Sequence, residues 1–257
     1  MTVRNVRGKG RVLVSGPIPE AVWTEMCATL NELDLSFTQV ELDGFMVGGI
    51  IYVCNALMED TDIALATEII TALGQAIGLA LDKAILYGTG NKMPMGIVTR
   101  LAQAEQPDDW DNNAPAWVNL SASNIIPISG KSGTALFKEI ILAGGKAKGK
   151  YSRGEKVWLM NETTKSTLVA EGISFNSAAA IVSGVENKMP VVGGDIVTLD
   201  FIPDGDIVTG YPLLYLLVER AGASISTSEH VRFIEDQTVF KGTARYDGKP
   251  VIGEAFA

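Results

Sequence analysis

Residues 59–96 read EDTDIALATEIITALGQAIGLALDKAILYGTGNKMPMG and carry the most regular hydrophobic pattern of the chain. Three carboxylates and a threonine stand at the start, where a helix favours negative charge and a capping side chain. Apolar residues then recur at spacings of three and four, which predicts a helix over 61–87 with one buried stripe. At 1.5 Å per residue this helix is roughly 40 Å long. Gly88 and Gly90 end it.

The glycine-rich segment 88–96 invites comparison with nucleotide-binding loops. A dinucleotide fingerprint places its glycines between a strand and the start of a helix, so that phosphate meets the helix N-terminus. Here the glycines follow a long helix, and the G-x-x-x-x-G-K-[ST] spacing of a phosphate loop is absent. We therefore predict no cofactor-binding site in this segment.

Three segments precede the long helix: a basic segment, a helical segment and a segment with β character. The formal net charge is −9, and residues 1–19 hold four basic side chains and no acidic one, so the remainder carries −13 (−9 minus +4). A solvated tail and an arm that lies on an acidic neighbour or on packaged nucleic acid both fit this charge. The apolar spacing of 20–33 predicts a helix. Two strand-like runs flank Asp43 and Gly44, which predicts a β-hairpin within 36–57.

Downstream of residue 96 the elements are mixed. Residues 103–133 are rich in Asp, Asn, Pro, Ser and Gly and are expected to form a long connection. Helices are predicted over 134–148 and 164–171, and strands over 156–160, 193–201, 213–220, 223–228 and 240–246. The order lacks βαβ regularity, so the predicted fold class is α+β.

Composition limits the function classes. Hydrophobic residues make up 47% of the chain, which is typical of a folded protein. The net charge argues against a protein whose main task is gripping phosphates. Polar and charged residues interrupt the most apolar segment, 63–87, so we expect no membrane span. The basic N-terminus lacks the apolar region of a secretory signal, which predicts a chain made and kept in a cytoplasm.

Few residues could support catalysis or metal binding. His230 is the sole histidine, so any Ser-His-Asp or Cys-His set must use it, and the chain has no G-x-S-x-G nucleophile elbow. We predict a surface or interface histidine. Cys27 and Cys54 lie in no CxxC motif and are expected to be buried free thiols. We predict no catalytic, cofactor-binding or metal-binding residues, no cofactor and no enzymatic activity.

Two parts of the chain carry a family resemblance. The first comprises NALMED at 55–60, ALDKAILYGTG at 80–90 and PMGI at 94–97; the second comprises Glu219, Arg220, TVFKGTAR at 238–245 and residues 250–256. Together they resemble the tailed-bacteriophage major capsid protein family, whose Hong Kong-type capsid fold is shared with encapsulins. The resemblance covers nearly the whole chain.

The resemblance implies names for the parts of an α+β capsid fold. Residues 1–33 would form the N-terminal arm and a short helix, and residues 34–57 an extended β-hairpin loop that reaches over a neighbour. Residues 59–123 and 222–257 would form the peripheral domain, with its spine helix at 61–87, and residues 124–221 the axial domain. The segment 88–96 would then be a structural turn, in which glycines reverse the backbone and Pro94 stiffens the exit.

The implied function is that of a structural subunit. Copies would self-assemble through pentamers and hexamers into an icosahedral shell around phage DNA, which the shell holds non-specifically. The chain would be found in the virion after assembly in the host bacterial cytoplasm, and portal, scaffolding or decoration proteins are further possible partners. An arm, an exposed hairpin and a thin body bury little surface within one chain, which suits assembly independently of the resemblance.

Three other functions compete with this one. An encapsulin-like nanocompartment would use the same fold to enclose cargo enzymes in place of DNA. A tail or other virion structural protein would form tubes or rings. A hydrolase with an α+β fold would depend on His230.

Overall fold

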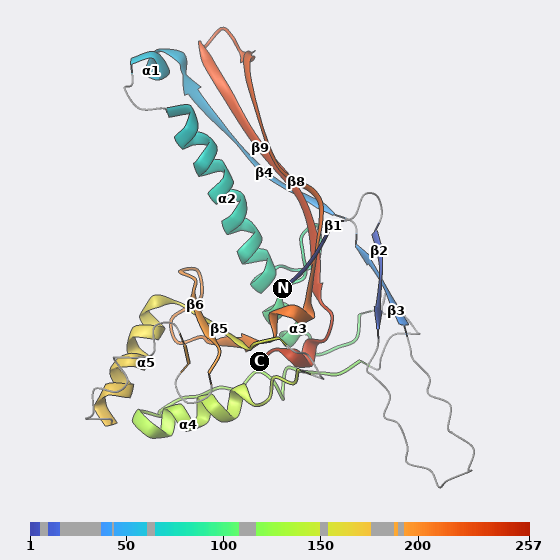
Figure 1. The fold of residues 1–257 in the computed structure, drawn as a ribbon, viewed down its shortest axis with the longest axis vertical. Helices are drawn as coiled ribbons and strands as arrows, with labels where there is room; N and C mark the ends of the chain where they lie inside the picture. The colour runs from blue at the N-terminus through green and yellow to red at the C-terminus, as the bar shows by residue number, and fades with distance from the viewer. Residues whose placement is uncertain are drawn as a thin grey trace.

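The computed structural model describes residues 1–5, 10–15, 37–42, 44–60, 65–107, 117–149, 154–175, 188–189 and 193–257. Within these residues the chain is α+β, as predicted, with three separate sheets and a long helix beside the largest of them (Figure 1). The helix predicted over 20–33 lies outside the described residues.

The largest sheet has the strand order β1-β8-β9-β4. Its strands are β1 (Thr2–Asn5), β8 (Tyr215–Arg232), β9 (Gln237–Pro250) and β4 (Phe45–Cys54). Strands β8 and β9 form a long antiparallel hairpin, β4 lies antiparallel on β9, and β1 lies parallel to the first residues of β8. The two strands predicted over 213–220 and 223–228 are one strand, because register shifts between Glu219 and Ser224 bend it without ending it.

The predicted hairpin around Asp43 and Gly44 is wrong in its pairing. Both flanking runs are strands, but β3 (Phe37–Leu42) pairs with β2 (Gly10–Ser15), while β4 pairs with β9. The local turn signal marked a strand boundary correctly. It could not reveal that β4 pairs with β9, where Val53 packs with Phe240 and with Ile69 and Leu73 of α2. Strands β1 and β2 show that part of the basic N-terminal segment is paired within the chain, which the sequence analysis did not predict.

The long helix α2 (Leu65–Tyr87) ends where predicted and follows the short α1 (Asn55–Asp60). Its Ile69 and Leu73 pack with Val53 and Phe240 of the large sheet. By length and composition alone α2 is apolar enough to cross a membrane, and the expectation of no membrane span stays a prediction. Ile70 and Leu79 of this helix are 41% and 50% exposed, so α2 also presents apolar side chains to the surface.

The second part of the molecule is built on the small sheet β6-β5-β7. Its elements are α4 (Gly133–Gly144), β5 (Val157–Met160), α5 (Glu162–Phe175), β6 (Asp195–Thr198) and β7 (Val208–Gly210). They enclose a core around Trp158, which is 1% exposed and packs with Ile140 and Leu168. The helices and strands predicted here are confirmed, with boundaries shifted by a few residues.

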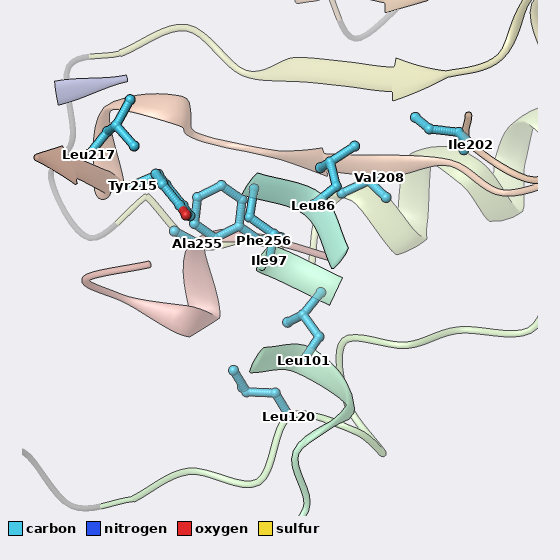
Figure 2. Close-up of a cluster of buried hydrophobic side chains, with 10 residues drawn as sticks. All are labelled: Leu86, Ile97, Leu101, Leu120, Ile202, Val208, Tyr215, Leu217, Ala255 and Phe256. Atoms are coloured by element: carbon cyan, nitrogen blue, oxygen red, sulfur yellow. The ribbon is translucent and has the colours of Figure 1, made fainter. Parts of the chain in front are cut away.

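A central cluster of apolar side chains joins the two parts (Figure 2). It draws Leu86 from the end of α2, Ile97 and Leu101 from α3 (Ile97–Ala102), which was not predicted, Tyr215 from β8 and Phe256 near the C-terminus. Two 3-10 turns, Pro212–Leu214 and Gly253–Ala255, lie beside it. Residues from both predicted domains share this core, and the domain boundaries themselves stay a prediction.

Candidate functional site

Within the described residues, the side chains with catalytic potential that the sequence singled out do not converge. His230 is exposed near the end of β8, where its backbone N–H donates weakly to Ser228 Oγ at 3.4 Å. Cys54 is exposed, which corrects the expectation of a buried thiol, and Cys27 lies outside the described residues. Within the described part of the chain, no three His, Cys, Asp or Glu side chains are grouped so that they could hold a metal ion.

The segment 88–96 forms a hydrogen-bonded turn that ties three elements together. Gly96 donates its backbone N–H to the carbonyl oxygen of Gly88 at 2.8 Å, and Met95 donates to Gly248 in β9 at 2.7 Å. The hydroxyl of Tyr215 in β8 donates to the carbonyl oxygen of Met95 at 3.0 Å. These bonds fix the end of α2 against β8 and β9, so the turn has the geometry of a structural joint.

One buried cation also has a structural position. Arg100 is 8% exposed, and its guanidinium lies 3.7 Å from the ring centroid of Trp117. It donates to the carbonyl oxygen of Val118 at 3.2 Å, and burial lowers the pKa of Arg100. The guanidinium therefore holds the connection after residue 117 against α3 through stacking and a hydrogen bond.

The most unusual described surface is the face of the large sheet opposite α2. Odd positions of β4 such as Val53 point to the helix, so even positions point away from it. Met46, Ile50 and Tyr52 stand on this outer face with 69%, 52% and 47% exposure. They form an apolar row along β4, one of the two edge strands of the described sheet.

Two further rows lie beside the apolar row. In register with Ile50 and Met46 are Lys241 and Arg245 of β9, both exposed. Hydroxyl side chains of β8 follow, with Ser224 opposite Thr243 and Ser226 opposite Lys241. We call this surface the outer sheet face and define it by Met46, Ile50, Tyr52, Lys241, Arg245, Ser224 and Ser226. Its charged side chains are both basic, in a chain of net charge −9.

The hairpin tip between β8 and β9 is also apolar. Val231, Phe233 and Ile234 are 70%, 79% and 96% exposed. The tip lies at one end of the longest axis of the molecule, far from the central cluster (Figure 1). Sequence reasoning missed both surfaces, because it could not assign the strand partners that place these residues on an outer face. The alternation of apolar residues at 46, 50 and 52 was the available signal for the first.

The described part of the chain leaves apolar side chains uncovered on two long elements. The hairpin of β8 and β9 exposes Ile234 at 96%, and α2 exposes Leu79 at 50%. Such surfaces are typical of a subunit whose neighbours cover part of it.

Similarity to known proteins is found at the level of a family model and not at the level of a curated sequence. A family model described as the phage capsid family matches residues 1–257. No curated protein sequence matches the chain.

Solved structures with the same fold are similar over almost the full length of the chain. The capsid of a native GTA particle shares 16% identity and a TM-score of 0.67, with 99% of this chain and 86% of that chain covered. A Mycobacterium phage Bobi structure shares 17% identity and a TM-score of 0.66, with coverage of 97% and 81%. The capsid of Cyanophage P-SCSP1u shares 11% identity and a TM-score of 0.62, with coverage of 99% and 84%.

Proposed function

The chain belongs to the phage capsid family, and from this premise we propose that it is a major capsid subunit whose copies assemble through pentamers and hexamers into a closed icosahedral shell around phage DNA. The subunit acts by forming contacts and performs no catalysis. Its place is in the virion, after assembly in the cytoplasm of the host. Portal, scaffolding and decoration proteins are further proposed partners.

The observation that carries the proposal, beside the family match, is the surface left uncovered in one copy. The large sheet has α2 on one face only, and its outer sheet face exposes Met46, Ile50 and Tyr52. Monomeric proteins seldom expose apolar rows of this kind, because burying such side chains is favourable wherever a partner is available. Contacts repeated head to tail around symmetry axes close into rings, and curved rings close into shells.

The charge of the chain suits a container better than a specific DNA-binding protein. A net charge of −9 repels phosphate at long range, so packaged DNA would be held by confinement and by local basic residues. No sequence-specific reading of bases is required of a shell. The proposed contact with DNA is therefore non-specific.

Electron microscopy of the purified protein, with light scattering on the same sample, tests the proposal. We expect closed particles, or flat rings with five and six members, and we expect nuclease-protected DNA in particles formed during infection. Particles that enclose protein cargo and no DNA would favour a nanocompartment, and open tubes would favour a tail protein. A protein that stays monomeric at high concentration and high salt would contradict the proposal, and loss of a hydrolase activity with His230→Ala would then assign an enzyme.

A further inference from the structure

We propose that the β8–β9 hairpin tip of one copy docks on the outer sheet face of a second copy of this chain. This inference rests on the proposed function as a shell subunit and names one of its contacts. The docking residues of the tip are Val231, Phe233 and Ile234, flanked by Glu229 and Glu235. The receiving residues are Met46 and Ile50 of the apolar row with Lys241 and Arg245 of the basic row, because Arg232 of the same chain already lies over Tyr52.

The composition of the tip is the first argument. Hairpin turns normally consist of Gly, Asn, Asp and Ser, because these residues adopt the required backbone and remain solvated. Here the tip presents Phe233 and Ile234 at 79% and 96% exposure. Neither side chain contributes much to the packing of its own chain. Exposed apolar side chains at the end of an extended element mark a contact with another molecule.

The second argument is that the tip is held in place. Arg232 lies 4.6 Å from the ring centroid of Tyr52 and 3.7 Å from Glu235. Asn55 at the start of α1 bonds Asp236 through its backbone and its side chain, at 3.0 and 2.7 Å. A preorganised tip loses little conformational entropy on binding, which favours affinity.

Complementarity argues that the occupant is a second copy. The tip combines three apolar side chains with the carboxylates of Glu229, Glu235 and Asp236 and one cation, Arg232. The outer sheet face combines the exposed apolar side chains of Met46 and Ile50 with Lys241 and Arg245. The apolar side chains of the tip would face those of the outer sheet face, and the acidic side chains of the tip would face its basic row. Such complementarity favours recognition between two copies.

The small size of the contact also fits an interaction between copies that is repeated many times. Three apolar side chains of the tip and two of the receiving face fall well short of the roughly 800 Å² per partner that a stable two-protein interface buries. The contact would therefore be weak alone and effective when repeated around a shell, since linked contacts add avidity. Both surfaces are on every copy, so each subunit can give its tip and receive another.

The experiment measures the protein concentration needed for assembly, by light scattering and electron microscopy. Phe233→Ser with Ile234→Ser should raise this concentration by about tenfold or more, because hot-spot apolar contacts carry much of the affinity. Phe233→Leu with Ile234→Val keeps the tip apolar and should assemble like the wild type. Leu79→Ser, at 50% exposure on α2, is the control for a general loss of surface hydrophobicity.

A charge-reversal pair identifies the receiving face. Lys241→Glu alone and Glu229→Lys alone should each weaken assembly, and the two combined should restore most of it. Circular dichroism and the unfolding midpoint of each soluble variant should match the wild type, because all four residues are exposed.

Several outcomes overturn the inference. Wild-type shells together with unchanged assembly of the double serine variant would reject the tip contact while leaving the proposed function intact. Failure of the combined charge reversal to recover assembly, or equal loss with Leu79→Ser, would reject the specific docking. Flotation of the protein with lipid vesicles that depends on Phe233 and Ile234 would assign the tip to a membrane. Absence of any wild-type assembly would remove the proposed function and this inference together.

Discussion

Asn55 and Asp236 are bonded twice although 181 positions separate them in the chain: the backbone N–H of Asn55 donates to the carbonyl oxygen of Asp236 at 3.0 Å, and Asn55 Nδ2 donates to Asp236 Oδ1 at 2.7 Å. The side chain of Asn55 also accepts the hydroxyl of Thr238 at 2.6 Å. Asp236 has a φ of 51°, in the left-handed region. The residue after β4 thus fixes the turn that follows the apolar tip.

Replacing Asn55 with alanine should loosen the tip. The change removes two side-chain hydrogen bonds and keeps the backbone bond, so the free energy of unfolding should fall by about 1 kcal/mol. Amide hydrogen exchange of residues 233–238 should become faster, because this region then opens locally. Ser226→Ala, on the same sheet, is the matched control and should leave this exchange unchanged. Identical exchange in Asn55→Ala would show that the side chain does not hold the tip.

Gly88 and Gly74 should respond to alanine in opposite directions. A Cβ at Gly88 would collide with the backbone carbonyl oxygens of Pro94 and Ala84, whereas a Cβ at Gly74 in the middle of α2 meets nothing within 4 Å. Gly88→Ala should therefore lower the free energy of unfolding by more than about 2 kcal/mol through strain in the turn. Gly74→Ala should raise it by roughly 0.5–1 kcal/mol, since alanine is the better helix former.

Urea unfolding, monitored by tryptophan fluorescence, measures the free energy of unfolding of Gly88→Ala and of Gly74→Ala. Both proteins carry the same added methyl group, so the difference reports the local backbone alone. Equal effects at the two positions would mean that segment 88–96 adjusts freely, and the structural-joint reading of this turn would fail.

Sequence reasoning succeeded where a local pattern is sufficient. The end of α2 at Tyr87 follows from helical periodicity that stops at Gly88, and the strand β5 follows from a short apolar run. Both signals lie within one element. The α+β class also follows, because it depends on the order of elements and not on their contacts.

Long-range pairing could not be derived in the same way. The turn signal at Gly44 is real, since φ there is 62°, but it does not state which strands pair. The parallel pairing of β1 with β8 places Thr2 in register with Leu216, and no local sequence pattern near either residue predicts it. The outer sheet face depends on these pairings, so the candidate surfaces became visible only in three dimensions.

Leu73 should be the residue that attaches α2 to the large sheet. It is 3% exposed and packs with Val53, Ile69 and Phe240. Leu73→Ala should lower the free energy of unfolding by about 2–4 kcal/mol, because it removes buried methyl groups and leaves a cavity. Leu79→Ala, at 50% exposure on the same helix, should change it by less than about 0.5 kcal/mol. Chemical denaturation of both variants makes the comparison, and similar losses would mean that α2 is not held by this face alone.

Tyr215 should make the free energy of unfolding depend on pH in the alkaline range. Burial, and secondarily the carboxylate of Asp247, raises the pKa of Tyr215 well above its ordinary value. The folded chain therefore keeps the phenol protonated, while the unfolded chain releases the proton near its ordinary pKa of about 10. Because the unfolded state then binds fewer protons, the free energy of unfolding is unaffected by this group below about pH 10 and falls as the pH rises further.

Tyr215→Phe separates this proton linkage from the hydrogen bond. At neutral pH the variant should be less stable by about 1 kcal/mol, because it loses the bond to the carbonyl oxygen of Met95. Above about pH 10 the wild type loses stability through Tyr215 and the variant does not, so the difference between them should narrow and then reverse. Burial also raises the pKa of Tyr87 and Tyr246, but both proteins retain these groups and their effect cancels in the difference. Unfolding midpoints measured from neutral to alkaline pH test the argument, and a difference that stays constant would show that Tyr215 ionises alike in both states.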